Sequence, residues 1–249
     1  MRALLALASL TLAAEDYKYF LTGNAGNAVV KTQPGFLLAG GGRDVDDAWR
    51  WFLGKAGGGD IVILRASGAD GYHSFPPRLG IAVDSVESIV FLNREASSNP
   101  EVLRIVNNAD ALFFAGGDQW NYVRFWKGTP VQDAIHAAVK RGIPIGGTSA
   151  GLAILGEFGF SAEKNTVTSK EALADPYHDK VTISRDFLKL PHLGCLITDS
   201  HFMERSREGR LLVFMARIKR ESKCRVVRAV GINERTAVLL EADEIGRAS

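Results

Sequence analysis

The stretch IPIGGTSAGLAIL, residues 143–155, places one serine between glycines, after an apolar run typical of a buried strand and before a run typical of a helix. Residues 147–151 fit the G-x-S-x-G pattern of a nucleophile elbow in its expected context of strand, sharp turn and helix. Small neighbours let the chain turn tightly and leave the oxygen of Ser149 exposed, with the N–H of Ala150 directed at a developing oxyanion. The alternative is a structural glycine turn whose serine has no chemical role.

The segments around this turn alternate between short apolar strands and helices. The expected strands are 36–38, 61–64, 88–93, 111–115 and 143–147. The expected helices start at Asp44 or Asp46, at Asn99 with Pro100 as first helical residue, and at Pro130 after a capping Thr129. This alternation predicts a mostly parallel sheet covered by helices on both faces. In such sheets the site lies beyond the carboxyl ends of the strands, where GGDQ (116–119) and GGTSAG (146–151) both fall.

The second half of the chain is less regular. Residues 156–190 are richer in polar residues and are expected to form loops and short strands beside the sheet. The segment 201–221 is helical in its second half by pattern, and 226–241 reads as two strands joined by a turn at Asn233 to Arg235. No internal repeat or linker interrupts the chain, so we expect one domain.

The composition is typical of a globular protein and does not indicate a nucleic-acid-binding protein. The chain has 249 residues, 46% hydrophobic and 23% charged, which is ordinary for a globular protein with a sizeable core. A net charge of +2, with dispersed basic residues, does not indicate a nucleic-acid surface, and small substrates are the expected partners.

The amino terminus has the pattern of a secretory signal peptide. Arg2 is followed by an apolar run from Ala3 to Ala14 and then by polar residues. We therefore expect residues 1–14 to be removed on export, leaving residues 15–249 as a secreted or periplasmic domain. The alternative is a buried amino-terminal segment in a cytoplasmic protein. No later segment reaches the roughly 20 apolar residues that a transmembrane helix needs, so no membrane partner is expected.

Cysteine usage leaves one question open. Cys195 and Cys224 are the two cysteines of the chain, too few for a disulfide framework and without CxxC spacing for a metal site. They could pair after export, but their spacing does not decide it.

A serine nucleophile needs a base, and His201 is the best candidate among the five histidines. It follows an apolar strand in LITDSHFMERSREGR (196–210), close to Asp199 and ahead of three arginines. Those arginines, Arg205, Arg207 and Arg210, could clamp a carboxylate. The alternative is a solvated helix face in which Glu204 and Glu208 pair with the arginines.

Four motifs carry a resemblance to a known family. LFFAGGDQ (112–119), GGTSAG (146–151), TDSHFMERSREGRL (198–211) and GINE (231–234) occur in the same order as in the cyanophycinase and aspartyl dipeptidase family of serine peptidases. The spacing is more similar to the cyanophycinases than to the shorter dipeptidases. The resemblance implies an α/β three-layer sandwich with a mostly parallel, doubly wound sheet and a nucleophile elbow, similar to class I glutamine amidotransferases.

The resemblance also implies roles for individual residues. Ser149 would be the nucleophile, His201 the base and Glu234 the acid that orients it, although Glu234 alone would read as a turn residue. Gly117 would complete the oxyanion hole with Ala150. Positions that match the substrate pocket of the family are Gln119, Asp199, Arg205, Arg207 and Arg210.

This sequence departs from the family pattern at two points, which concern the substrate preference and the carboxyl end that the resemblance implies. Ser200 stands where cyanophycinases have glutamine, which puts a strict preference for the β-Asp-Arg unit in doubt. The chain also stops at Ser249, whereas family members usually continue through a further strand or hairpin, so a truncated carboxyl end is expected.

The sequence thus predicts a serine-type, exopeptidase-like or dipeptidase-like hydrolase of aspartyl or β-aspartyl peptides, with the β-Asp-Arg unit of cyanophycin as one candidate. No metal or organic cofactor is required, and a homodimer is compatible with the resemblance. An α/β-hydrolase esterase is a second interpretation, although the chain lacks an HGGG-type oxyanion motif. A third is a catalytically inactive relative that only binds peptides.

Overall fold

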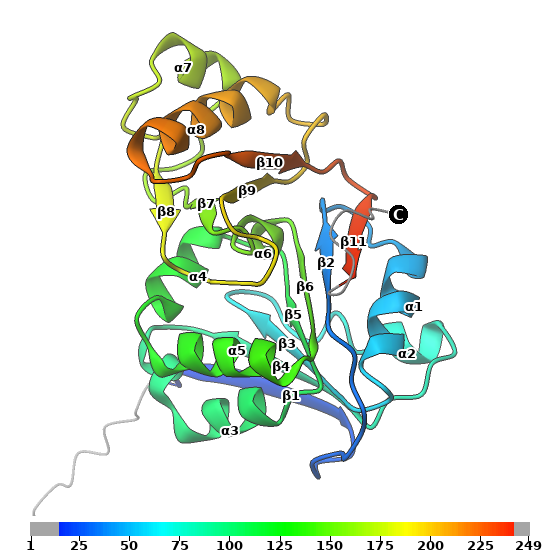
Figure 1. The fold of residues 1–249 in the computed structure, drawn as a ribbon. Coiled ribbons are helices and arrows are strands. Elements are labelled where there is room, and N and C mark those ends of the chain that lie inside the picture. Colours follow the sequence, from blue (N-terminus) through cyan, green and yellow to red (C-terminus); the bar gives the residue numbers. More distant parts are fainter. Residues whose placement is uncertain (1–14, 242–249) are drawn as a thin grey trace, which may run out of the picture.

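The computed structural model describes residues 15–241 and places a second, smaller sheet at the carboxyl edge of a large one (Figure 1). The expected signal peptide, residues 1–14, and the last residues, 242–249, lie outside the described residues. Within the described range no helix is both long and apolar enough to cross a membrane.

The large sheet has seven strands, and its five inner strands are parallel. Their spatial order is β1 (Tyr17–Gly23), β4 (Ser85–Phe91), β3 (Asp60–Arg65), β5 (Ala111–Phe114), β6 (Pro144–Thr148), β2 (Gly35–Ala39) and β11 (Ala237–Glu241). The two edge strands, β1 and β11, run antiparallel to their neighbours. The five strands expected between residues 36 and 147 are all present, and the α/β class is confirmed. The edge strand β1 was not expected from sequence.

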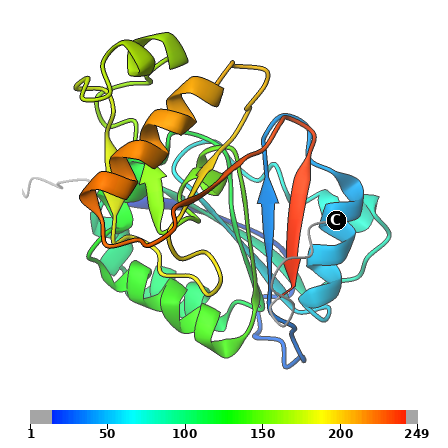
Figure 2. The ribbon, with the colours of Figure 1, turned by 45° about the horizontal axis from the view of Figure 1, so that its top comes forward.

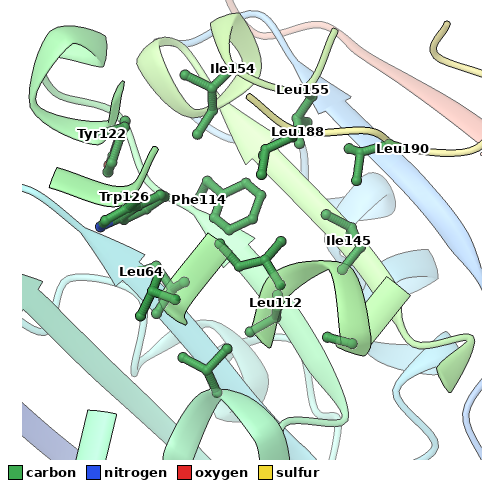
Figure 3. Packing of buried hydrophobic residues seen from close by; sticks show 14 of the residues in the cluster. Leu64, Leu112, Phe114, Tyr122, Trp126, Ile145, Ile154, Leu155, Leu188 and Leu190 are labelled. Atoms are coloured by element: carbon green, nitrogen blue, oxygen red, sulfur yellow. The ribbon is translucent and has the colours of Figure 1, made fainter. Parts of the chain in front are cut away.

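Helices cover both faces of this sheet, as its apolar strands require. One face packs against α1 (Asp46–Lys55) and α2 (Phe75–Arg78); the other packs against α3 (Pro100–Asn108), α4 (Gln119–Trp126) and α5 (Pro130–Arg141), with the short turn η1 (Glu95–Ser98) beside them. Successive strand residues point to opposite faces, so Phe113 packs on the first side and Phe114 on the second. Figure 3 shows the second side, where Phe114 and Leu112 lie among Tyr122, Trp126 and Ile145.

The helix boundaries follow the expected signals in part. Asn99 caps α3 by accepting the N–H of Glu101 at 2.9 Å, and Gly142 ends α5 in the left-handed conformation at φ 79°. Thr129 occupies the cap position of α5, but its hydroxyl donates to the carbonyl of Trp126 instead of capping the helix. The first helix begins at Asp46, with Val45 at its cap.

The smaller sheet has the order β10 (Arg228–Gly231), β9 (Leu196–Asp199), β7 (Phe158–Phe160) and β8 (Ile183–Arg185). Its strands β7 and β8 are among the short strands expected between residues 156 and 190, whereas the helix at Ser169–Ala174 in that range was not expected. The helices α7 (Ser169–Ala174) and α8 (Glu208–Glu221) pack against each other over it (Figure 2). The strands on either side of Asn233 are β10 and β11, so the chain passes from the small sheet to the edge of the large one at this turn. Cys195 and Cys224 form a disulfide bond.

Candidate active site

The turn between β6 and the short helix α6 (Ala150–Ala153) holds Ser149 in a strained conformation with φ 53°. The two flanking glycines are required by close backbone contacts. A Cβ at Gly147 would lie 2.6 Å from the carbonyl oxygen of Gly151, and one at Gly151 would lie 2.0 Å from that of Phe114. Larger residues could not occupy either position without moving backbone, so the G-x-S-x-G spacing follows directly from the packing of this elbow.

Three residues distant in sequence meet at the elbow. Ser149 Oγ lies 2.7 Å from His201 Nε2, and His201 Nδ1 lies 2.6 Å from Glu234 Oε1. A carboxylate can only accept, so Nδ1 carries the ring proton and Nε2 is left to accept the proton of Ser149. His201 is buried, with 7% of its surface exposed, whereas Ser149 is partly open to solvent. This is the geometry of an activated nucleophile, its base and an orienting acid.

The carboxyl end of β2 holds all three segments through consecutive carbonyl groups. Ala39 accepts the N–H of Ser149 at 3.1 Å, Gly40 accepts the N–H of His201 at 2.8 Å, and Gly41 accepts the N–H of Arg235 at 2.9 Å. Sequence reasoning treated the glycines at 40–42 as a simple turn and missed this role. The run of three glycines after a strand was the available signal.

A side chain at position 41 would collide with the ring of His201, so only glycine fits there. The φ of Gly41 is +100°, and a Cβ there would lie 2.4 Å from Cε1 of His201. Any substitution would therefore push on the imidazole itself, in addition to straining the backbone.

The predicted oxyanion groups lie on either side of Ser149. Ala150 is the first residue of α6, and Gly117 follows β5 with φ 151°. The adjacent Gly116 faces the serine closely, since a Cβ there would lie 3.4 Å from Ser149 Cβ. The absence of side chains at 116 and 117 leaves room for a carbonyl group beside Ser149, where backbone N–H groups could bind an oxyanion.

A polar cavity of about 620 Å³ opens beside this triad. Four of the predicted substrate-binding residues line it: Gln119, Arg205, Arg207 and Arg210. Gly117 also lines the cavity, so the cavity reaches the glycines beside Ser149. The loop before α7 also lines the cavity and contributes Glu163 and Asn165. Gln119 donates to the carbonyl of Phe160 at 3.2 Å and is thereby fixed at the start of α4.

Asp199 lies behind the cavity wall and holds two of the arginines. It is 3% exposed and receives two hydrogen bonds from Arg210, at 2.8 Å from Nε and 2.6 Å from Nη2, and one from Arg207 at 3.2 Å. Arg210 is itself 2% exposed. The expected alternative, in which Glu204 and Glu208 pair with these arginines, is not what the structure shows, because the described ion pairs of Arg207 and Arg210 both go to Asp199.

The arginines differ in the charge that they offer to the cavity. Arg210 is neutralised by its two-point contact with Asp199, whereas Arg205 is exposed on the cavity wall. Burial lowers the pKa of Arg207 to about 10, and the neighbouring Arg210 adds to this effect while Asp199 opposes it. Ser200 contributes its carbonyl and hydroxyl as acceptors for Arg207, at 2.8 and 3.3 Å.

Two carboxyl groups on the loops that follow β10 and β2, Glu234 and Asp44, have shifted pKa values. The hydrogen bond from His201 lowers the pKa of Glu234, so this group remains ionised below the usual range of a glutamate. Burial raises the pKa of Asp44, in the loop after β2, to about 6, although contacts with Trp49 and Tyr72 and the charge of Arg78 act in the opposite direction.

The described residues contain one group whose side chains could together approach a metal ion. The ligand atoms of Glu157, Cys195 and Cys224 lie within 4.8 Å of one another. The two sulfurs are joined in the disulfide, whereas metal binding needs thiolates.

Comparisons with known proteins show which sequences and folds this chain is similar to. The model of Peptidase family S51 matches residues 70–247. A cyanophycinase of Trichormus variabilis is 25% identical over 227 residues, covering 85% of this chain and 69% of that protein. For a cyanophycinase of Geminocystis herdmanii the identity is 26% over 220 residues, with 84% and 74% covered. A cyanophycinase of Synechococcus elongatus is 28% identical over 201 residues, covering 77% of this chain and 57% of that protein.

Solved structures share the fold. A peptidase from an acI-B1 Actinobacterium superposes with a TM-score of 0.59 at 16% identity, covering 86% of this chain and 85% of that one. A putative peptidase E from Listeria monocytogenes has a TM-score of 0.52 at 15% identity, with 86% and 96% covered. The resemblance expected from the four sequence motifs is thus confirmed.

Proposed function

Because the chain belongs to peptidase family S51, we propose that it is a serine peptidase whose nucleophile is Ser149. The observation that carries the proposal is the continuous hydrogen-bonded line from Ser149 through His201 to Glu234, with contacts of 2.7 and 2.6 Å. Family membership indicates a peptidase-type hydrolase. The chemistry of these three side chains supports the serine mechanism.

In the proposed reaction, Ser149 Oγ attacks the scissile carbonyl carbon while His201 Nε2 takes its proton. Glu234 keeps the imidazole in the required tautomer and stabilises the positive charge that forms on it. The backbone N–H groups of Gly117 and Ala150 stabilise the oxyanion of the tetrahedral intermediate. His201 then gives the proton to the leaving amine, and a water molecule hydrolyses the acyl-enzyme in the same way.

For the substrate, we propose an aspartyl or β-aspartyl peptide. The relatives matched by sequence are named cyanophycinases. The cavity offers the exposed Arg205 together with Arg207 for a carboxylate. Asp118 and Glu163 line the same cavity and offer negative charge to a cationic group, such as the arginine of a β-Asp-Arg unit. A substrate that carries both charges fits this distribution better than an uncharged peptide or a simple ester.

The test compares the parent protein with Ser149→Ala. Both are incubated with cyanophycin and with a panel of α- and β-aspartyl peptides, and the products are identified by mass spectrometry. Release of β-Asp-Arg by the parent alone would support the full proposal and show that Ser200 is compatible with this substrate. Cleavage of other aspartyl peptides alone would keep the mechanism and change the specificity. Equal turnover by Ser149→Ala, or none by the parent, would refute the serine mechanism.

We further propose that the protein acts outside the cytoplasm. The supporting observations are the signal-like residues 1–14 and the Cys195–Cys224 disulfide, because such bonds persist mainly in oxidising compartments. The test is the amino-terminal mass of the protein recovered from each cell fraction. An intact Met1 in a cytoplasmic fraction with two free thiols would contradict the proposal.

A further inference from the structure

The disulfide lies at the start of the two strands that lead to His201 and Glu234. Cys195 directly precedes β9, which ends at Asp199 shortly before His201. Cys224 lies between α8 and β10, and β10 ends at Gly231 shortly before Glu234. The two strands are parallel, so they leave the disulfide in the same direction and bring their following residues to the same end of the sheet. One covalent bond therefore closes the end of this strand pair that lies opposite the active site.

The polar contacts of β10 are concentrated at its two ends: the side chain of Arg228 donates to the carbonyl groups of His192 and Gly194 at 3.0 and 2.6 Å, and the N–H of Ile232 donates to the carbonyl of Asp199 at 2.9 Å. This strand is the edge strand of the smaller sheet and pairs only with β9, through the partners Arg228 to Gly231 on β10 and Leu196 to Asp199 on β9. Its residues are exposed or half-buried, in contrast with the fully buried β9. The N–H of Arg228 donates to the carbonyl of Cys195 at 2.8 Å, so the register of the two strands begins at the disulfide. Ala229 and Val230 are half-buried against two different core clusters, and the exposed residues at the two ends of β10 are held by these terminal connections.

The same cysteine is also connected to the segment that carries the nucleophile. The side chain of Glu157, between α6 and β7, accepts the N–H of Cys195, and the N–H of Glu157 donates to the carbonyl of Leu193 at 3.2 Å. Cys195 has φ 51°, a conformation that residues other than glycine adopt only when their surroundings hold them. Thus Cys195 is anchored to the chain that follows Ser149, and through its sulfur to the chain that leads to Glu234.

We propose that the Cys195–Cys224 disulfide is a positioning element for the His201–Glu234 pair. This inference rests on the proposed function, because it gives the disulfide a part in orienting the base. Without the bond, β10 can shift or rotate against β9 at its exposed start, and the displacement reaches Glu234 at its other end. A displacement of about 1 Å at a catalytic group can cost on the order of 100-fold in rate, so a small movement is enough. A disulfide that only stabilises the fold would not have this effect.

The experiment uses the full-length double variant Cys195→Ser/Cys224→Ser and two measurements, both made well below its unfolding temperature. The first is the low-field proton NMR resonance of the His201 ring N–H that donates to Glu234, assigned by its loss in Glu234→Gln. The second is kcat and KM for the substrate that the parent cleaves. We expect the resonance to move upfield or broaden and kcat to fall by about 10- to 100-fold, with KM changed less than about twofold.

The matched control is Val62→Ala, which removes buried volume from β3 in the large sheet and leaves the disulfide intact. It should lower the unfolding temperature while keeping the resonance and kcat of the parent. If the double variant does not fold, the folded parent reduced with TCEP, with two free thiols verified by mass, supplies the same measurements.

An unchanged resonance with unchanged kcat in the disulfide-free protein would overturn the inference, and so would an equal loss in Val62→Ala. The NMR measurement does not require turnover, so the inference is tested even if the serine mechanism fails. Failure of the proposed function is recognised separately, by a parent without peptidase activity or by an active Ser149→Ala.

Discussion

The seven-stranded and four-stranded sheets each supply part of the active site, but they are held together in different ways. Ser149 follows β6, which pairs with β2 along five residues and lies among fully buried strands. His201 and Glu234 follow β9 and β10; β9 meets β7 at a single residue pair, Phe158 with Ile197, and β10 is largely exposed at its ends. The strand that leads to the nucleophile is thus held mainly by apolar packing, whereas the strands that lead to the base and the acid depend more on specific polar and covalent connections.

Two of those connections lie within the smaller sheet, the Asp199–Arg210 pair and the disulfide. The third is the set of carbonyl groups at the end of β2, through which the larger sheet holds the residues that follow β9 and β10. This arrangement predicts that losing a polar contact of the smaller sheet lowers activity or stability, whereas losing an exposed ion pair or a buried charge beside the larger sheet does not. Four substitutions test that expectation.

The largest effect is expected for Glu234→Gln. The amide keeps the size of the side chain but can offer an N–H to His201 Nδ1, which favours the wrong tautomer of the base. We expect kcat to fall by about 10³-fold, equivalent to about 4 kcal/mol of activation free energy. The free energy of unfolding should change by less than about 0.5 kcal/mol, because the Glu234 side chain is partly exposed at 31%.

Steady-state kinetics and urea unfolding of the same preparation measure these two quantities. A loss of activity below tenfold would mean that backbone contacts from β2 orient His201 without help from Glu234. A large loss of stability would show that the pair supports the fold and not only the base.

The second prediction concerns the free energy of unfolding and compares the loss of a buried ion pair with the loss of an exposed one. Asp199→Asn removes the charge that Arg210 needs in a fully buried site, so the unfolding free energy should fall by about 3 kcal/mol. Glu101→Gln on α3 breaks the Arg104 pair, whose side chains are 51% and 49% exposed, and should cost less than about 0.5 kcal/mol. Chemical denaturation of both variants measures the contrast. Equal losses would contradict the view that the smaller sheet depends on its buried polar contacts.

The sequence predicted the larger sheet more completely than the smaller one, for a physical reason. Buried parallel strands are continuous apolar runs, and Gly147, Ser149 and Gly151 form a local pattern that steric contacts require. The role of His201 could be predicted from its chemistry, but the role of Glu234 was predicted only through the family resemblance. Its role depends on a contact between segments far apart in sequence, and no local pattern encodes such a contact.

The same limit applies to other features of the site. The carbonyl groups of Ala39 to Gly41 act through the backbone, which the sequence letters do not describe. The pairing of Cys195 with Cys224 was left open because it depends on the parallel pairing of β9 and β10. Asp199 was expected to line the substrate pocket; the structure places it behind the wall, where its burial could not be inferred from its position in a motif.

The third prediction concerns an unfavourable charge on the larger sheet. The pKa of Asp44 is raised from 3.8 to about 6 in the folded protein, so the folded state binds this proton more tightly than the unfolded state. Stability is therefore lost as the pH rises from 3.8 to about 6, and the penalty is fully present above pH 6. Asp44→Asn should raise the unfolding free energy by about 2 kcal/mol at pH 8 and leave it nearly unchanged at pH 3.5.

Denaturant unfolding at both pH values measures this difference, with the exposed Asp47→Asn as the control that should show little change at either pH. A destabilised Asp44→Asn at pH 8 would mean that the ionised carboxylate makes favourable contacts that outweigh its burial. The expected result would show that the well-packed sheet tolerates an unfavourable charge, whereas the smaller sheet depends on favourable ones.

The smallest effect is expected at the cavity wall, where Arg205 is exposed and contacts no other part of the fold through a described ion pair. Arg205→Ala should raise KM for an aspartyl substrate about tenfold and change kcat little, because a carboxylate contact made equally in substrate and transition state is lost. Arg220→Ala, on the exposed side of α8, removes the same charge away from the cavity and should leave both parameters unchanged. Initial-rate kinetics over a range of substrate concentrations measure both variants. If kcat falls instead of KM rising, Arg205 acts on the reacting groups, and the smaller sheet then contributes to the chemistry itself through more than its histidine and glutamate.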